Sequence, residues 1–367
     1  MTTASSRSSM LDRLLADFDE RKPAALARAV SIVENHRDGF ETLLGSFQPR
    51  LGRARRIGMT GPPGAGKSTL TTALAEAFRA RGLTVGIIAV DPTSPFTGGA
   101  LLGDRIRMER VALDDGVYIR SLATRGSLGG LSRATRETAD VLDAYGFDRI
   151  LIETVGVGQS ELDVARTADT TLVVLVPESG DAIQTLKAGL MEIADIFAVN
   201  KADRPGADRM LNDIEVMLGM RSGMTRGELP AHHGVDLKSA ELKRKLNPSR
   251  VAREAAADDS ADQWTPPVLR TIATQGEGIP KLYEALDRHH RYLERSGVLH
   301  ERRLQRMRER VIETTEHRIS RRLWQDPETN SWLDAQLPAL ERGELTPFNV
   351  ADALLARSGD LITRIDR

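Results

Sequence analysis

The stretch Gly61-Pro62-Pro63-Gly64-Ala65-Gly66-Lys67-Ser68 follows an apolar β-rich run, Ile57–Thr60, and precedes an alanine-rich run of helical character, Leu70–Ala80. It completes the pattern G-x-x-x-x-G-K-[ST] in its strand, loop and helix context. Glycines let backbone N–H groups converge on an anion, and the following helix presents its positive N-terminal end. The stretch therefore predicts a phosphate-binding loop for a nucleoside triphosphate. Lys67 is expected at the β- and γ-phosphates, Ser68 at Mg²⁺ and Thr69 near the α-phosphate.

A second motif, Asn200-Lys201-Ala202-Asp203, ends the apolar run Ile196–Val199. The carboxylate of Asp203 can accept hydrogen bonds from N1–H and N2–H₂ of guanine, whereas adenine lacks this pair of donors and would leave a buried acceptor unpaired. We therefore expect GTP to be preferred to ATP. The later loop that contains Ile272, Ala273 and Thr274 is expected to place backbone N–H groups against guanine O6, although Ile272 stands where such proteins usually carry serine.

Two acidic segments are candidates for the magnesium and water site. The buried run Arg149–Glu153 ends in a carboxylate and is followed by Gly156, which is free to approach the γ-phosphate. Glu153 stands where many GTPases carry aspartate, which favours coordination through water. Asp91 follows the run Thr84–Val90, and Asp104 lies in the glycine-rich stretch after it, so this segment resembles a switch that orders around Mg²⁺ and the γ-phosphate.

Composition limits the class of protein. The 367 residues carry a formal net charge of −1, and 28% of them are charged residues of both signs, so no global field favours nucleic acid or an anionic membrane. The chain has no cysteine, which excludes disulfides, thiolate zinc sites and cysteine nucleophiles. No apolar run reaches the roughly 20 residues of a membrane span, and the start of the chain lacks a signal-peptide core. A cytoplasmic location is expected by default.

The order of elements predicts the fold class. Short β-rich runs alternate with helical stretches, which indicates an α/β P-loop NTPase with a mostly parallel central sheet covered by helices on both faces. The expected strands are Ile57–Thr60, Thr84–Val90, Val117–Arg120, Arg149–Glu153, Thr171–Val176, Ile196–Val199 and Val268–Ile272. Ligands bind beyond the carboxyl ends of such strands, where every motif above falls.

Helical extensions are expected at both ends of the chain. Residues 1–50 form an N-terminal helical extension, 51–295 the GTPase domain with an insertion at 221–263, and 296–367 a C-terminal helical dimerisation region. In that last region an apolar stripe repeats at helical spacing and suggests a homodimer. The stripe consists of Leu304, Met307, Val311, Thr315, Ile319 and Leu323. The pair His289 and His290 is expected between helices, at the surface or in packing.

Taken together, the motifs resemble one family closely. GPPGAGKST, VDPTSPFTGGALLGDRIRM, ETVGVGQSE, GDAIQTLKAGLMEIADI and VNKAD are similar to the MeaB/ArgK-type G proteins, relatives of the signal-recognition and nickel-insertion GTPases. The resemblance implies a homodimeric GTPase that assists an adenosylcobalamin-dependent acyl-CoA mutase, typically methylmalonyl-CoA mutase, with a cobalamin adenosyltransferase as a further partner. It also implies phosphate and Mg²⁺ roles for the following residues: Lys67, Ser68, Asp91, Asp104 and Glu153.

Three departures from the family pattern leave the choice of mutase open. Asp181–Thr185 varies from the D-E-L-Q-G form of the mutase chaperones, the serine before Ala273 is missing, and the insertion after Met220 is long. A mutase for isobutyryl-CoA or hydroxyisobutyryl-CoA remains an alternative partner. The resemblance also implies that Gly180–Lys187 forms a further mobile switch that responds to the partner.

Hydrolysis is expected to be slow in isolation and faster with a mutase, which would order the switches so that Asp104, Arg105 or Lys187 orients water or offsets charge. Three other functions are alternatives. A kinase for amino-acid-binding transport proteins would transfer phosphate to protein, and a metal-insertion GTPase would be expected to carry Cys or His clusters near the switches. A targeting GTPase would need a Met-rich or basic RNA-binding module, whereas the 10 methionines are scattered.

Overall fold

The computed structural model describes residues 2–92, 108–124, 130–154, 160–177, 189–221 and 263–359. The chain divides into two compact units, Met1–Leu299 and His300–Arg367, which are described separately below. The predicted insertion at 221–263 lies almost entirely outside the described residues.

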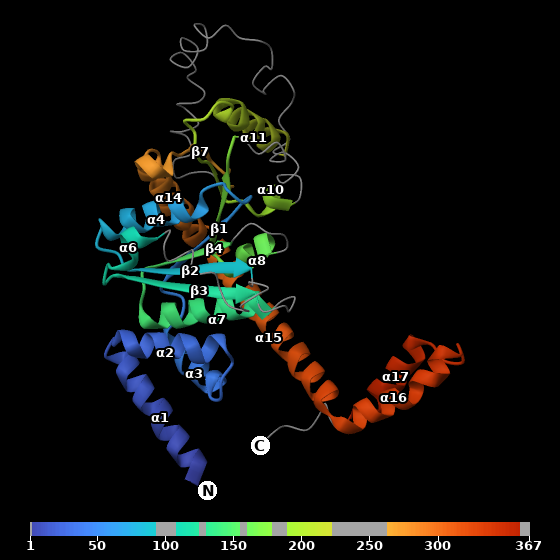
Figure 1. Cartoon of the computed structure of the whole chain (residues 1–367). Helices are drawn as coiled ribbons and strands as arrows, with labels where there is room; N and C mark the ends of the chain where they lie inside the picture. The colour runs from blue at the N-terminus through green and yellow to red at the C-terminus, as the bar shows by residue number, and fades with distance from the viewer. Residues whose placement is uncertain are drawn as a thin grey trace, which may run out of the picture. The chain divides into compact units, whose positions relative to one another are not determined.

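A seven-stranded parallel sheet forms the centre of the first unit (Figure 1). The strand order is β3-β2-β4-β1-β5-β6-β7, so β1 pairs with β4 on one side and with β5 on the other. The α/β class and the parallel sheet predicted from the sequence are confirmed. The strands are β1 Arg55–Thr60, β2 Val85–Pro92, β3 Val117–Thr124, β4 Arg149–Thr154, β5 Thr170–Leu175, β6 Ile196–Val199 and β7 Val268–Arg270.

Helices cover both faces of this sheet, as Figure 1 shows. Those of the first unit are α1 Thr2–Asp19, α2 Pro23–Glu34, α3 Phe40–Phe47, α4 Lys67–Arg79, α6 Glu109–Ala112, α7 Gly130–Tyr145, α8 Ser160–Thr167, α10 Met191–Ile193, α11 Ala207–Arg221 and α14 Ile279–Arg295, with the short 3₁₀ helices η1 Gln48–Arg50 and η3 Ala273–Gln275. Pro23 occupies the first turn of α2, where its missing N–H costs no hydrogen bond.

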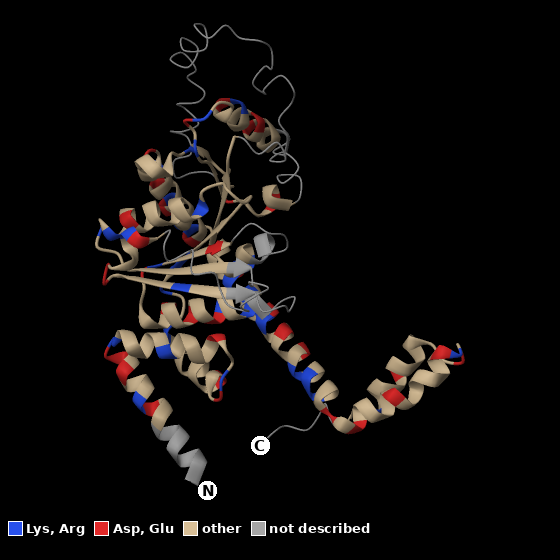
Figure 2. Ribbon diagram, in the orientation of Figure 1, with Lys and Arg blue, Asp and Glu red and all other residues tan. Residues whose placement is uncertain are grey.

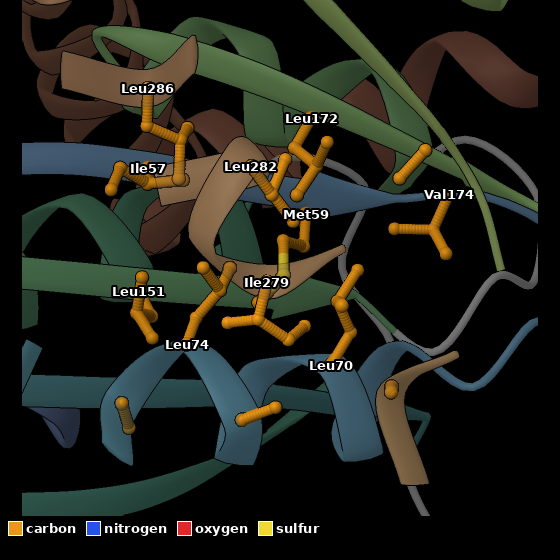
Figure 3. Close-up of a cluster of buried hydrophobic side chains, with 14 of the residues drawn as sticks. Ile57, Met59, Leu70, Leu74, Leu151, Leu172, Val174, Ile279, Leu282 and Leu286 are labelled. Atoms are coloured by element: carbon orange, nitrogen blue, oxygen red, sulfur yellow. The ribbon is translucent and has the colours of Figure 1, made fainter. Parts of the chain in front are cut away.

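One core lies between the sheet and helices α4 and α14. Figure 3 shows its centre, where Met59 of β1 lies among leucine and isoleucine side chains from both helices and the neighbouring strands. Alternate strand residues face this side because successive side chains of a strand point to opposite faces. The labelled members are Ile57, Met59, Leu70, Leu74, Leu151, Leu172, Val174, Ile279, Leu282 and Leu286.

The opposite face is covered by α7 and α8 and, beyond α7, by the N-terminal helices. Ile88, Ile150 and Ile152 of the strands share a buried cluster with Leu142 of α7 and with Phe18 and Phe47 of the N-terminal helices. The rings of Phe18 and Phe47 stack with centroids 4.4 Å apart. A third cluster lies against α11. It contains the residues of β5 and β6 that alternate with those of the first core, among them Val173 and Phe197. The N-terminal helices are therefore an added layer on this face of the sheet.

A buried ion-pair network fixes β1 to α7. A guanidinium nitrogen of Arg56 lies 2.8 Å from Asp140 and 3.0 Å from Asp143. Asp143 also accepts hydrogen bonds from the backbone N–H groups of Gly52 and Ala54, at 2.8 and 2.9 Å. Burial opposes the charge of Arg56, yet the nearby carboxylates outweigh it and raise the pKa of the guanidinium above its usual value. The segment that leads into β1 is thereby held to the helical layer.

The expectation that His289 and His290 lie between helices is wrong. Both residues lie within α14, and both are buried. Nδ1 of His289 is 2.8 Å from the hydroxyl oxygen of Thr170, and its ring packs 4.6 Å from that of Trp264. The pair therefore belongs to the packing of α14 on the sheet.

The second unit is helical. It contains most of α15 (Val298–Gln325), together with α16 (Pro327–Glu341) and α17 (Pro347–Arg357). Asp326 caps α16 by accepting from the N–H of Thr329 at 2.7 Å, and Thr346 caps α17 by accepting from the N–H of Asn349 at 3.2 Å. Basic and acidic residues are interleaved along the helices (Figure 2). Among the described residues, no helix is both long and apolar enough to cross a membrane.

Candidate functional site: a phosphate-binding loop at the carboxyl edge of the sheet

The loop Gly61–Gly66 joins the end of β1 to the start of α4, and its backbone requires glycine at two points. Gly61 has φ +137°, and a Cβ built there would overlap the carbonyl oxygen of Val174 in the neighbouring strand β5. Gly66 has φ +83°, and a Cβ there would come within 2.5 Å of Nδ2 of Asn200. The tight path of the loop against β5 and Asn200 therefore leaves no room for side chains at these positions.

Lys67 begins α4 and folds back over this loop. Its Nζ donates hydrogen bonds to the carbonyl oxygens of Gly61 at 2.7 Å and Pro62 at 3.0 Å, and the side chain is buried. Pro63, Gly64 and Thr69 are exposed around it. An ammonium group and the N-terminus of a helix thus lie beside the same loop, an arrangement that suits an anion.

The Ser68 and Glu153 side chains meet at the base of the loop. Oγ of Ser68 lies 2.6 Å from Oε1 of Glu153, and Oγ1 of Thr71 lies 2.7 Å from Oε2 of the same carboxylate. Glu153 is 6% exposed and is the penultimate residue of the buried strand β4, directly opposite Met59 of β1 in the sheet register. Hydroxyl and carboxylate oxygens are the ligands that Mg²⁺ prefers, so this pair fits the cation predicted from the sequence.

Asn200 connects the phosphate-binding loop to the loop that follows β7. Its Nδ2 donates to the carbonyl oxygen of Ala65 at 2.8 Å, while its Oδ1 accepts from the N–H of Ala273 at 3.1 Å and from the hydroxyl of Thr271 at 3.2 Å. All four residues are buried. One side chain therefore fixes the relative positions of three segments that are distant in sequence.

The residues expected at the purine surround this bridge. Lys201 takes a left-handed conformation with φ +54°, and Asp203 and Thr274 are exposed. The N–H of Ala202 donates to the carbonyl oxygen of Thr271 at 3.2 Å, and that of Ile272 donates to the carbonyl oxygen of Glu277 at 3.0 Å. The turns after β6 and β7 are thus bonded to each other, with the Asp203 carboxylate directed to solvent.

Several predicted residues fall outside this description. Asp104, Gly156 and Lys187 lie outside the described residues, as do Arg105 and the whole of the expected switch at 180–187. The backbone of Asp91 belongs to β2, but its side chain is not described. The structure therefore brings together the residues of the phosphate-binding loop, Glu153, Asn200 and the loop at 272–274.

Sequence reasoning missed two hydroxyl groups of this site, those of Thr71 and Thr271. Thr71 lies three residues after Ser68 and four after Lys67, so the three share one face of α4. A hydroxyl-bearing residue at helical spacing from Lys67 and Ser68 was the available signal. Thr271 lies beside Asn200 only because β7 pairs with β6, which local sequence does not reveal.

The sequence of the chain matches known proteins over most of its length. Residues 26–328 match the family model described as "Methylmalonyl Co-A mutase-associated GTPase MeaB". A Pyrococcus abyssi protein named as a GTPase is 46% identical over 302 residues, which cover 82% of this chain and 83% of that protein. GTPase ArgK of Escherichia coli is 34% identical, covering 88% and 89% of the two chains.

Two further similarities extend over most of the chain. The mouse "Methylmalonic aciduria type A homolog, mitochondrial" is 31% identical, covering 94% of this chain and 79% of that protein. The crystal structure of a protein named "LAO/AO transport system kinase" matches with a TM-score of 0.63 and 26% identity, covering 95% and 97% of the two chains. Together with the loop geometry, these matches confirm the family predicted from the sequence: the chain belongs to the MeaB family and is a GTPase that binds guanine nucleotides.

Proposed function

We propose that this GTPase is a nucleotide-dependent chaperone of an adenosylcobalamin-dependent acyl-CoA mutase. It gates loading of the cofactor and protects or reactivates the mutase, which is methylmalonyl-CoA mutase or a relative acting on isobutyryl- or hydroxyisobutyryl-CoA. The match of residues 26–328 to a family described by its association with methylmalonyl-CoA mutase carries this proposal. The mouse relative named for methylmalonic aciduria supports it. A cobalamin adenosyltransferase is proposed as a further partner.

In this proposal the phosphates lie against the loop Gly61–Gly66. Lys67 exchanges its hydrogen bonds to the carbonyl oxygens of Gly61 and Pro62 for phosphate oxygens, which as anions are stronger acceptors. Asn200 holds the loop at Ala65 while Asp203 reads the guanine edge. Thr274, which is exposed in η3, is proposed to offer its N–H group to guanine O6. Its neighbours Ile272 and Ala273 already use their amides within the protein.

The cation site is proposed around Ser68 and Glu153. Mg²⁺ bound there would neutralise phosphate charge. Ser68 offers a hydroxyl oxygen at the first turn of α4, and the buried carboxylate of Glu153 lies 2.6 Å from it. Asp91 and Asp104 complete the proposed set from the sequence, and Lys187 is proposed to offset charge during hydrolysis.

We also propose a homodimer formed through the C-terminal helical region. In the second unit the expected stripe on α15 is largely uncovered: Leu304, Met307 and Val311 are 48%, 46% and 66% exposed. Apolar groups at this spacing along one helix favour burial against a partner of matching pattern. Light scattering is expected to give twice the chain mass, and replacing Val311 with lysine is expected to shift the protein towards monomer.

The nucleotide part of the proposal is tested by calorimetry with the full chain. GTP and GDP are expected to bind with Mg²⁺ present, at least about tenfold more tightly than ATP, because an adenine base leaves the Asp203 carboxylate without its paired donors. Equal or tighter binding of ATP would contradict the guanine assignment.

The chaperone part is tested separately by co-purification with candidate mutases in the presence of GTP or GDP, followed by turnover. Hydrolysis by the GTPase alone is expected to be slow, and the true mutase is expected to accelerate it. Equal turnover with and without every mutase that binds would contradict the proposed role while leaving the GTPase activity intact.

A second candidate function is a kinase acting on amino-acid-binding transport proteins, favoured by the similarity to a crystal structure whose protein is named as a transport system kinase. It predicts transfer of the γ-phosphate to a protein acceptor instead of release as inorganic phosphate. Nucleotide labelled at the γ-phosphate distinguishes the two, because label on protein supports the kinase and label in free phosphate supports the GTPase.

A further inference from the structure

Two hydroxyl groups of α4 bind one carboxylate at the base of the phosphate-binding loop. Ser68 bonds Oε1 of Glu153 at 2.6 Å, and Thr71 bonds Oε2 at 2.7 Å. Thr71 has no exposed surface, and Glu153 is almost fully buried. Each oxygen of the carboxylate therefore has its own donor, and the donors come from one face of one helix.

The chemistry of these groups fixes where the protons lie. A carboxylate only accepts, whereas a hydroxyl has one proton and two lone pairs. Oγ1 of Thr71 is also 2.9 Å from the carbonyl oxygen of Lys67, but the charged carboxylate is the stronger acceptor and takes the proton. Ser68 likewise donates its proton to Glu153. The lone pairs of Ser68 then remain directed away from the carboxylate.

We propose that Thr71 is a positioning residue: its hydroxyl fixes the Glu153 carboxylate so that Oε1 holds the proton of Ser68 and leaves the lone pairs of Ser68 free for a cation. The inference rests on the proposed nucleotide and magnesium site. Glu153 then acts on the cation indirectly, through Ser68 and water. Thr71 holds Oε2, the second carboxylate oxygen of Glu153, in place. Without Thr71, Oε2 of Glu153 loses the hydroxyl that lies 2.7 Å from it, so the orientation of the carboxylate towards Ser68 is less tightly fixed.

Thr72 provides a matched control within the same helix turn. It is buried, and its hydroxyl donates to the carbonyl oxygen of Ser68 at 3.0 Å. The hydroxyl oxygen of Thr71 lies at a similar 2.9 Å from the carbonyl oxygen of Lys67, but its proton goes to Glu153. Among the described residues, the Thr72 hydroxyl has only this partner. The two threonines therefore share residue type, burial and a hydroxyl close to the backbone carbonyl four residues earlier, and they differ in the contact with Glu153.

The test measures how much Mg²⁺ strengthens nucleotide binding. The dissociation constant of a fluorescent GDP analogue is determined in EDTA and in Mg²⁺, and the ratio of the two values reports the coupling. Thr71→Val is expected to reduce this ratio by about tenfold, the worth of a hydrogen bond to a charged group, while the value in EDTA stays within about twofold. Thr71→Ser, which keeps the hydroxyl, is expected to retain the ratio, and Thr72→Val to leave both constants unchanged.

If the valine variant does not fold, the comparison of Thr71→Ala with Thr71→Ser tests whether the hydroxyl of Thr71 is needed for the coupling. These two variants lack the same methyl group and differ only in the hydroxyl, so loss of coupling in alanine alone supports the proposal. Retained coupling in Thr71→Val or Thr71→Ala, or equal loss in Thr71→Ser and Thr71→Ala, overturns it. If the wild-type protein shows no guanine-nucleotide binding, the proposed site itself fails, which is a different result.

Discussion

Asn200, directly after β6, holds the phosphate-binding loop in place: its Nδ2 donates a 2.8 Å hydrogen bond to the carbonyl oxygen of Ala65. The same carboxamide accepts from Ala273 and Thr271, so three segments depend on it. Removing the side chain leaves each of these buried partners without its bond, at roughly 1–3 kcal/mol per group. The role proposed for this residue in nucleotide binding is therefore coupled to its role in stability.

We expect Asn200→Ala to lower both the free energy of unfolding and the affinity for GDP, the latter by at least about tenfold, because the loop loses its anchor. Urea denaturation and calorimetry measure the two effects. Asn35→Ala is the control, because Nδ2 of Asn35 also donates to a backbone carbonyl, that of Ser31 at 2.9 Å, but in the N-terminal layer. Its GDP affinity should match wild type. Unchanged GDP affinity in Asn200→Ala would contradict the proposed loop.

Asp203→Asn is expected to change which base is preferred. The asparagine amide donates where the aspartate only accepts, so it opposes the N1–H and N2–H₂ donors of guanine and matches the additional carbonyl of xanthine. GDP affinity should fall and xanthosine diphosphate affinity should rise, both measured by competition against a fluorescent nucleotide. Because Asp203 is exposed, the free energy of unfolding should stay within about 0.5 kcal/mol of wild type.

The control for that change is Glu215→Gln, which removes one negative charge from an exposed position on α11. It should leave the preference for guanine over xanthine unchanged. A switch of preference in Glu215→Gln, or none in Asp203→Asn, would show that Asp203 does not read the base.

Gly61→Ala is expected to disrupt the phosphate-binding loop. Gly61 has φ +137°, and the added Cβ would overlap the carbonyl oxygen of Val174, a backbone atom of β5 that cannot swing away. Gly82→Ala is the matched comparison: its φ is +76°, but no heavy atom lies within 4 Å of the added Cβ. Denaturation should show a loss of about 1 kcal/mol for Gly82→Ala from backbone strain alone. Gly61→Ala should lose clearly more and bind no GTP; equal losses with intact binding would contradict the steric argument.

Much of the fold follows from local pattern. Runs rich in β-branched residues predicted all seven strands, because strands buried on both faces are continuously apolar. The positions of Lys67, Ser68 and Glu153 at strand ends followed in turn. The shared hydrogen bonds of Glu153 did not, since they depend on α4 lying over the β1 and β4 pair. That packing is a tertiary contact, and no spacing of residues along the sequence predicts it.

His289 illustrates a pattern that was available but outweighed by residue type. Leu282, Leu286, His289 and Leu293 follow one another at helical spacing, and all four are buried on one face of α14. Two adjacent histidines suggested a polar boundary between helices. The helical periodicity continues through them, however, and indicates a single helix. The ring satisfies its Nδ1 against Thr170, which explains how a histidine occupies an otherwise apolar face.

Arg56→Met is expected to destabilise the first unit. The variant leaves the carboxylates of Asp140 and Asp143 buried without the guanidinium that lies 2.8 and 3.0 Å from them. Breaking a buried ion pair from one side lowers the free energy of unfolding by about 3–5 kcal/mol, which urea denaturation measures. Because the carboxylates raise the pKa of Arg56, which is already high, the wild-type guanidinium stays charged through the pH range of folding.

The double variant Arg56→Met/Asp140→Asn tests whether charge or volume is responsible. It removes one of the two buried carboxylates that lose the guanidinium in the single variant, so it should recover part of the lost free energy. Asp143 keeps its partners in the double variant, since the N–H groups of Gly52 and Ala54 still donate to it. Recovery therefore assigns the loss to the Asp140 carboxylate that no longer faces the guanidinium, whereas a double variant no more stable than Arg56→Met would assign it to the lost packing of the arginine side chain.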